Sequence, residues 1–178
     1  MTFTYLHRKN RKRFAALPAL YASYRQETVC NHGGKKHSLH TFKAELKRVL
    51  KHTDECVWSN NPRCFVVLHE EDKILGFADI RVKTQDLDAF FYLQDPKNPP
   101  PVYGTVEDFC IAPSERGEGY GRILYDRVET VFKQNATKTV YLTPDPKTGV
   151  QFWEKMGYTN TTHTLPDTES YVFKKEIK

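Results

Sequence analysis

The chain has 178 residues, of which 39% are hydrophobic, 13% aromatic and 28% charged, and its formal net charge is +5. This length suits one domain of roughly 100–200 residues, and the lack of long polar or repetitive tracts argues against global disorder. No run approaches the roughly 18 apolar residues that a membrane span needs, and no apolar segment of signal-peptide length follows the basic start. We therefore expect one soluble domain over residues 1–178, cytoplasmic and without a membrane partner.

Positive charge is concentrated near the N-terminus. Residues 1–51 hold 12 Lys and Arg against 2 Asp and Glu, whereas the remaining residues hold 15 against 20. Such a segment could contact nucleic acid or the phosphates of a cofactor. Its basic residues follow helical patterns and form a dense cluster only at 8–13, so we interpret them as solvated helix faces. A nucleic-acid partner is accordingly not expected.

The four cysteines form no C-x-x-C pair, which in a reducing compartment predicts free thiols. Cys30, His32, His37 and His40 have a spacing that would permit a metal site. No second Cys/His cluster accompanies them, however, and we favour a polar loop between two helices. We expect no bound metal.

The first half of the chain predicts a strand, two helices and a hairpin. Thr2–Leu6 alternates weakly, and apolar residues at three- and four-residue spacing predict a helix over 11–28. Ser38 is a suitable N-cap for a second amphipathic helix. Cys64–Leu68 and Ile74–Val82 flank an acidic turn and are typical of a β-hairpin.

The second half begins with the segment 84–101, which contains a triple proline and is predicted to be a loop. An 18-residue loop in a compact domain is often functional. The elements predicted after it are the strand Val102–Ile111, the helix Arg122–Gln134, the strand Lys138–Thr143, the short helix Gly149–Lys155 and the strands Tyr158–Thr164 and Tyr171–Glu176.

The most informative segment is the run 116–122, Arg-Gly-Glu-Gly-Tyr-Gly-Arg, between a predicted strand and a predicted helix. Glycines at alternate positions permit positive φ and close approach of a ligand. The N–H groups of a helix N-terminus form an anion site suited to phosphate. The spacing differs from the dinucleotide fingerprint G-x-G-x-x-G, and no G-x-x-x-x-G-K-[ST] occurs. Taken alone, the run also fits a strand-to-helix turn without a ligand.

The surrounding sequence resembles the GNAT family of N-acetyltransferases. Residues 116–121 fit every position of that family's central motif, [RQ]-x-x-G-x-[GA], and residues 106–117 resemble its preceding strand and proline-containing connector, which here is Ala112–Pro113. Phe-Trp-Glu-Lys-Met-Gly-Tyr at 152–158 resembles its second signature, usually a Phe-Tyr pair before a Gly-aromatic. The ordered resemblance covers residues 64–176. It implies an α/β (α+β) fold with a mixed central sheet, helices on both faces and the order β-α-α-β-β-β-α-β-α-β-β.

The resemblance also implies acetyl-CoA as the cosubstrate. Its pyrophosphate would lie on the amides of the glycine-rich turn, and its pantetheine arm would pair with the splayed end of the preceding strand. For Phe152 and Trp153, plain core packing is at least as good an explanation as cofactor contact. The implied cofactor-binding residues are Arg116, Gly117, Glu118, Gly119, Tyr120, Gly121 and Arg122 at the pyrophosphate, Phe109, Cys110 and Ile111 along the arm, and Phe152.

Transfer to an amine needs a proton acceptor, because freeing an amine with a pKa of about 10.4 at pH 7 costs about 4.6 kcal/mol. Glu107 and Asp108, on the strand that leads to the thioester, are the candidate bases. Many family members have an acid at the position of Asp108. Strand alternation points adjacent residues to opposite faces, although a bulge would change this. One of the two acids could instead be solvated while the other pairs with an arginine.

The departing CoA thiolate raises a second question, because the family often protonates it with the tyrosine of the Phe-Tyr pair. This chain has Trp153 at that position, and an indole N–H is not a useful proton source. Either the thiolate leaves with little help, or Tyr158, Tyr120 or Tyr103 substitutes.

We therefore expect an N-acetyltransferase that moves an acetyl group from acetyl-CoA to a primary amine of a small molecule or peptide by direct attack on the thioester. The alternative is a catalytically weak CoA-binding sensor or regulatory module, which Trp153 would fit. The loop 84–101 and the first two helices are expected to shape the amine pocket, where Asp86, Asp88 and Asp95 would favour a cation or be solvated. The resemblance makes a homodimer possible.

Overall fold

The computed structural model describes residues 1–7, 10–31, 38–56, 63–84, 103–164 and 170–178. Among these residues the order of helices and strands is the predicted one, with two short 3-10 turns added. The elements are β1 (Thr2–Tyr5), η1 (Arg11–Arg13), α1 (Leu17–Asn31), α2 (Leu39–Cys56), β2 (Arg63–Glu70), β3 (Lys73–Thr84), β4 (Tyr103–Ile111), η3 (Pro113–Glu115), α3 (Tyr120–Gln134), β5 (Thr139–Leu142), α4 (Val150–Lys155), β6 (Thr159–Thr164) and β7 (Tyr171–Glu176).

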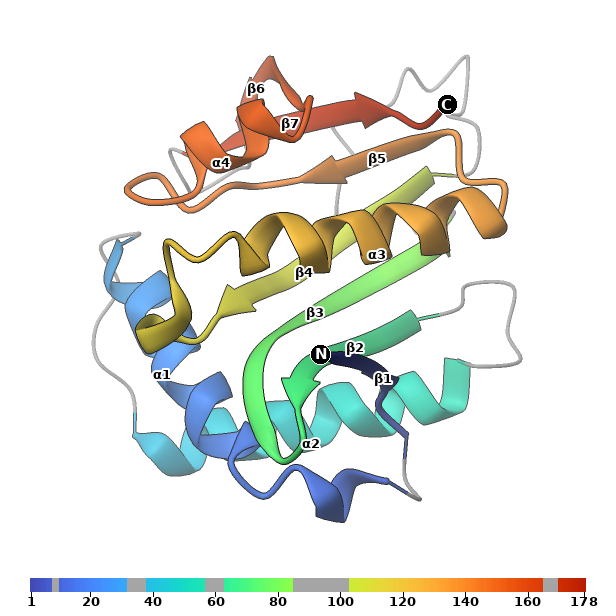
Figure 1. The fold of residues 1–178 in the computed structure, drawn as a ribbon. Coiled ribbons are helices and arrows are strands. Elements are labelled where there is room, and N and C mark those ends of the chain that lie inside the picture. The colour runs from blue at the N-terminus through green and yellow to red at the C-terminus, as the bar shows by residue number, and fades with distance from the viewer. Residues whose placement is uncertain (8–9, 32–37, 57–62, 85–102, 165–169) are drawn as a thin grey trace.

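The strands form one mixed sheet in the order β1-β2-β3-β4-β5-β7-β6. The first four strands are antiparallel neighbours, β4 and β5 are parallel, and β7 is antiparallel to both β5 and β6. Figure 1 shows that β4 and β5 diverge towards the end of the molecule at which α1 and the turn before α3 lie. The sheet therefore consists of two parts joined at a single parallel pair.

Helices cover both faces of this sheet, as predicted. On β2, Val66 and Leu68 belong to the core beneath α3, whereas Phe65 and Val67 belong to the core beneath α1 and α2. Because β2 has buried residues on both faces, the sheet is the middle layer between helices on its two sides. In Figure 1, α3 crosses in front of the sheet and α2 lies behind it.

The first helix begins later than the predicted range 11–28. Residues 11–13 form a 3-10 turn, and α1 begins at Leu17. Pro18 explains the difference, because proline lacks an N–H and its ring clashes with the carbonyl four residues earlier, so it is tolerated only in the first helical turn. The second helix has the predicted cap: the Ser38 Oγ accepts a hydrogen bond from the Thr41 N–H at 3.2 Å.

A bulge interrupts the β3–β4 pairing next to the candidate bases. Asp79 pairs with Asp108 and Ile80 pairs with Val106, so Glu107 is an extra residue in β4. Such a bulge breaks the strict alternation of side chains along the strand. The predicted loop 84–101 and its aspartates, and also His32 and His37, lie outside the described residues.

Candidate active site

The glycine-rich turn directly precedes α3 and leaves its backbone uncovered. Gly117 and Gly119 have φ values of 91° and 81°, which L side chains rarely adopt. Gly119 is the N-cap of α3, and no side-chain hydrogen bond caps this helix. A Cβ built at either glycine would meet nothing within 4 Å. The first N–H groups of α3 therefore face open space, as an anion site requires.

The third glycine of the turn has a different role. A Cβ at Gly121 would lie 3.0 Å from the ring of Phe152. The absence of a side chain at this position therefore lets the start of α3 pack closely against α4.

One edge of β4 is free beside the turn. β4 pairs with β5 only at Gly104 and Thr105. Backbone groups along a strand alternate in direction, and the Phe109 N–H bonds outside the sheet, to Tyr24, while the Ala112 N–H bonds to Leu75 of β3. Phe109 and Ile111 thus direct their backbone groups to the free edge.

The backbone groups of Cys110 point the other way, towards β3. A peptide-like arm added to this edge would therefore pair with Phe109 and Ile111 rather than with Cys110. The thiol of Cys110 is buried, and burial raises its pKa to about 12.

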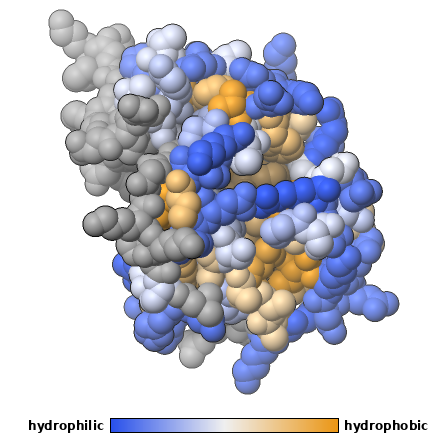
Figure 2. Space-filling view, turned by 90° about the vertical axis from the view of Figure 1, so that its left-hand side faces the viewer, coloured by the Kyte–Doolittle hydropathy of each residue, from blue (hydrophilic) through white to orange (hydrophobic). Residues whose placement is uncertain are grey.

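The turn, the free edge of β4, α1 and α4 enclose a cleft of about 1300 Å³. Figure 2 faces this end of the molecule, where hydrophobic residues lie exposed between bands of hydrophilic ones. Of the implied cofactor-binding residues, Glu118 and Tyr120 do not line the cleft. Those that line it are Phe109, Cys110, Ile111, Arg116, Gly117, Gly119, Gly121, Arg122 and Phe152.

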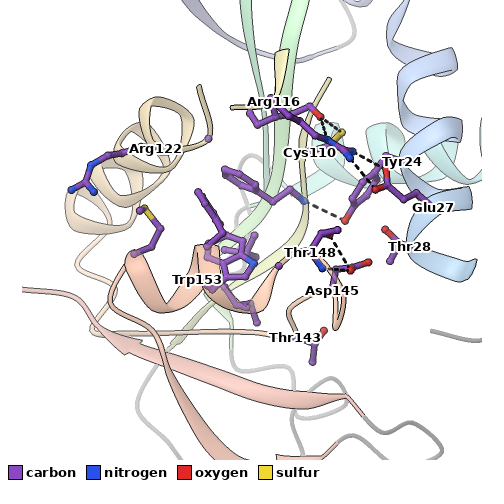
Figure 3. Close-up of a pocket in the computed structure, with 18 of the residues that line it drawn as sticks. Tyr24, Glu27, Thr28, Cys110, Arg116, Arg122, Thr143, Asp145, Thr148 and Trp153 are labelled. Carbon is purple, nitrogen blue, oxygen red and sulfur yellow. Dashed lines mark hydrogen bonds and ion pairs between the residues drawn. The ribbon is translucent and has the colours of Figure 1, made fainter. Parts of the chain in front are cut away.

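The two arginines of the turn differ in their surroundings. The Arg116 guanidinium forms a bidentate pair with Glu27 of α1 at 2.7 and 2.9 Å, and its Nε donates to the Ile111 carbonyl at 3.2 Å. The hydrogen bonds that Arg116 donates to the Glu27 carboxylate raise the pKa of Arg116. Figure 3 shows this pair at one side of the cleft and Arg122 on α3 at the other. Arg116 therefore bridges α1 and the turn.

Because of the bulge, both candidate bases contact groups on the face that carries α1 and α2. Glu107 lines the cleft, and its carboxylate lies 3.4 Å from Arg81 and accepts a hydrogen bond from Thr105. Asp108 lies beneath α1, with Tyr21 at 3.3 Å and Arg25 at 3.4 Å. The expectation from strand alternation, that the two acids point to opposite faces, is therefore wrong.

The exposure of the two acids differs as well. The side chain of Glu107 is 27% exposed and that of Asp108 is 7% exposed. Burial first, and then the negative charge of Asp79, raises the pKa of Asp108 to about 7. Asp79 is itself buried against Arg63.

Trp153 belongs to an aromatic cluster between α4, α3 and β4. Its ring contacts those of Phe109, Phe152, Tyr125 and Tyr158 with centroid separations of 4.9–5.6 Å. The Tyr158 hydroxyl is buried and accepts a hydrogen bond from Tyr125 at 3.3 Å. Tyr158 is thus part of the core, and it does not line the cleft.

The first two helices were expected to shape the pocket, but sequence reasoning named none of the α1 residues that line it. Tyr24, Glu27 and Thr28 line the cleft from this helix, and Asp145 and Thr148 line it from the loop before α4. The spacing of the three α1 residues, at i, i+3 and i+4, places them on one helix face, which is a signal available in the sequence. The sequence gives no signal, however, for the strand that this helix face contacts.

Two further observations concern the described part of the chain. No helix in it combines the length and apolar character needed to cross a membrane. Within the same residues, no group of three or more His, Cys, Asp or Glu side chains is arranged to hold a metal ion.

Comparison with known proteins gives the family. The sequence profile described as the Acetyltransferase (GNAT) family matches residues 19–158. No curated protein matched the sequence. The matched residues span most of the chain, and the fold is that of an acetyltransferase domain. The chain belongs to the GNAT family.

Solved structures share this fold at low sequence identity. A PaiA N-acetyltransferase from Thermoplasma acidophilum, solved with coenzyme A, is 12% identical over 99% of both chains, with a TM-score of 0.65. The ribosomal-protein-S18-alanine N-acetyltransferase from Escherichia coli is 15% identical over 99% of this chain and 94% of its own, with a TM-score of 0.56. An aminoglycoside 6'-acetyltransferase type Ii is 17% identical over 100% and 98%, with a TM-score of 0.61.

Proposed function

We propose that this protein transfers an acetyl group from acetyl-CoA to a primary amine of a small molecule or peptide. The observation that carries the proposal is the uncapped N-terminus of α3, with its positive-φ glycines, beside the free edge of β4. Membership of an acetyltransferase family supports it. Three structural neighbours also support the proposal. One is named as an N-acetyltransferase in complex with coenzyme A, and the other two as acetyltransferases for an alanine of a ribosomal protein and for an aminoglycoside.

The cleft has the chemistry that acetyl-CoA requires. The N–H groups at Gly117–Gly121 and the exposed Arg122 suit a pyrophosphate. The backbone of Phe109 and Ile111 can pair with the amides of a pantetheine arm, and Phe152 supplies an apolar wall. With phosphates at the turn, the arm runs back along β4, so the acetyl group would lie near Phe109 and Glu107.

Glu107 is our choice for the base. It lines the cleft at the position where the arm would end, whereas Asp108 is covered by Tyr21 and Arg25. A base must come within hydrogen-bond reach of the amine or of one intervening water. Glu107 would accept the ammonium proton, and the freed amine would attack the carbonyl carbon.

The turn can be tested with Gly119→Val. A side chain at this position has open space in this structure, so it would project where a phosphate is proposed to lie. We expect calorimetric CoA affinity to fall by at least about 100-fold, as for the loss of several charge-assisted hydrogen bonds. Thiol release from acetyl-CoA, followed with polyamines, aminoglycosides and peptide N-termini, should fall with it.

Gly157→Val is the matched control, because Gly157 also has positive φ (87°) but follows the C-cap of α4 and does not line the cleft. Both variants carry the backbone strain of a β-branched residue at positive φ, about 1–2 kcal/mol. Only Gly119→Val should lose CoA. Equal affinities in the two variants would refute the assignment. If the protein binds CoA but no amine accelerates thiol release from acetyl-CoA, the alternative function, a CoA-binding sensor or regulatory module, would be favoured.

A further inference from the structure

An acetyl transfer leaves the CoA sulfur with an electron pair that a proton must neutralise. The family often supplies this proton from the tyrosine of its Phe-Tyr pair, and this chain has Trp153 at that position. Its indole is enclosed by aromatic rings. Among the tyrosines that the structure describes, Tyr158, Tyr120 and Tyr103 do not line the cleft. Tyr158 bonds to Tyr125, and Tyr103 packs against Tyr141 in a separate small cluster.

Tyr24 is the described tyrosine that does line the cleft. Its hydroxyl oxygen accepts a hydrogen bond from the Phe109 N–H at 3.4 Å. This N–H lies on the free edge of β4, and Figure 3 shows the Tyr24 side chain at the wall of the cleft on the α1 side. The separation exceeds the usual 2.7–3.2 Å, so the bond is weak and readily exchanged for a substrate contact.

Packing fixes the ring in this position. It stands edge-on to Phe77 at a centroid separation of 5.5 Å and packs against Tyr21 at 6.5 Å. The hydroxyl uses a lone pair towards Phe109, which leaves its own hydrogen available to an acceptor in the cleft. That location is where the arm along Phe109 and Ile111 would end in its sulfur.

We propose that Tyr24 is a catalytic residue that donates its hydroxyl hydrogen to the CoA sulfur as the carbon–sulfur bond breaks. The inference rests on the proposed acetyl transfer. The proton donor then comes from α1, because Trp153 of α4 is not a useful proton source. Tyr24 would reach the sulfur from the side of β4 opposite to α4.

The protons balance as follows. An ammonium substrate loses one proton to Glu107, and the neutral nitrogen forms its bond to the carbonyl carbon. When the carbon–sulfur bond breaks, sulfur takes the electron pair and the Tyr24 hydrogen. The nitrogen's second proton restores the Tyr24 hydroxyl through water, and Glu107 releases its proton to solvent. The products are the amide, a CoA thiol and one proton.

Burial keeps the proposed donor protonated. Desolvation raises the pKa of Tyr24 well above its ordinary value, so the hydroxyl stays protonated at physiological pH. A thiolate in the same surroundings is destabilised as well. Burial thus acts on the pKa of both partners, and the position of the hydroxyl beside the Phe109 N–H carries the assignment.

The first experiment compares CoA with desulfo-CoA, which lacks only the sulfur, on the wild-type protein and on Tyr24→Phe. Calorimetry gives four dissociation constants. If the hydroxyl contacts the sulfur, the wild type should prefer CoA by about 2- to 10-fold, the range of one hydrogen bond. Tyr24→Phe should bind both ligands equally, because its ring still packs on Phe77. The readout needs no amine substrate.

The second experiment measures turnover with the best amine of the panel. Tyr24→Phe should lower kcat by about 100-fold, at the lower end for a general acid, with the KM for acetyl-CoA little changed. The wild type should show a larger solvent deuterium effect on kcat than the variant. Tyr125→Phe is the matched control: it removes another buried hydroxyl, from α3, that does not line the cleft.

The outcomes separate the two proposals. If the wild type does not bind CoA, the proposed function fails and this inference fails with it. If CoA binds but the preference over desulfo-CoA is the same in Tyr24→Phe, or if its kcat equals that of Tyr125→Phe, Tyr24 is not the donor and the proposed function stands. Restored turnover with a fluorinated tyrosine at position 24 would support donation by the phenol.

Discussion

Glu107 and Asp108 are neighbours in the chain but occupy different surroundings. The bulge leaves Glu107 at the cleft beside Arg81, while Asp108 is held under α1 by Tyr21 and Arg25. An acid that is 7% exposed cannot meet an amine without movement of α1. Glu107 therefore suits contact with the substrate, and Asp108 suits anchoring of the helix that carries Tyr24.

Replacement of Glu107 tests this division. Glu107→Gln keeps the side-chain shape and the bond from Thr105 but cannot accept a proton. We expect kcat/KM for an amine to fall by about 100-fold, as for the loss of a general base. CoA affinity should be unchanged by calorimetry. Glu154→Gln, at an exposed position on α4, should behave as wild type.

Asp108→Asn should instead change the pH dependence of stability. The pKa of Asp108 is raised to about 7 in the fold, against about 3.9 in an unfolded chain. The folded state therefore binds the proton more tightly, and this group's contribution to stability falls as pH rises from about 4 to about 7. As the pH rises from 5 to 8, the Tm of the wild type should fall by more than the Tm of Asp108→Asn. A loss of kcat in Asp108→Asn, with Glu107→Gln near wild type, would reverse the assignment of the base.

Helices, strands and turns could be predicted from the sequence where their cause lies within one short segment, and not where it depends on contacts with distant segments. The β4–turn–α3 unit depends on glycines and periodicity within one stretch, and its prediction was confirmed. Ser38 capped the helix it precedes. The bulge at Glu107 depends on register with β3, and the face of α1 that carries Tyr24 depends on where the sheet splays. Neither is a property of a single stretch of sequence.

The delayed start of α1 is an instructive exception, because its cause was local. Apolar spacing ran through residues 11–28, but Pro18 restricts the helix to a start at Leu17. Periodicity identifies a helix better than it identifies the ends. The late start matters for the site, because α1 leads from this point to Tyr24 and Glu27.

The bridge between α1 and the turn carries the next prediction. Arg116 is bound to Glu27, so a phosphate would compete with this carboxylate for the guanidinium. Both side chains are partly exposed, and such a pair contributes at most about 1 kcal/mol. Glu27→Gln should free Arg116 and tighten CoA binding by about 2- to 5-fold in calorimetry. Weaker binding would mean that the pair builds the site by holding α1 in place.

For the whole molecule, the sheet has two parts that share one core. β4 and β5 pair at only two positions of each strand. The core under α3 nevertheless includes Val66 and Leu68 from one part and Val140 and Phe173 from the other. Since α3 packs on both parts, they should unfold together, and a ligand in the cleft between them should stabilise the whole.

Thermal unfolding tests this coupling. CoA at about 100 times its Kd adds about 2.7 kcal/mol, and for a chain of this length each kcal/mol raises Tm by about 2–4 °C. We expect one transition that shifts upwards by roughly 5–10 °C. The shift should disappear in Gly119→Val and remain in Gly157→Val. Two transitions, of which CoA moves only one, would show that the parts unfold independently.

The same measurement separates cofactor binding from attraction by the basic N-terminal segment. Residues 1–51 carry a large excess of positive charge, and a duplex DNA ligand would bind it through many phosphates, with affinity that falls steeply as salt rises. CoA binding depends on a few amides and one or two arginines, so its shift should persist at moderate salt. We expect no DNA-induced shift at low salt. A DNA shift equal to that of CoA and lost with added salt would assign the basic segment to nucleic acid.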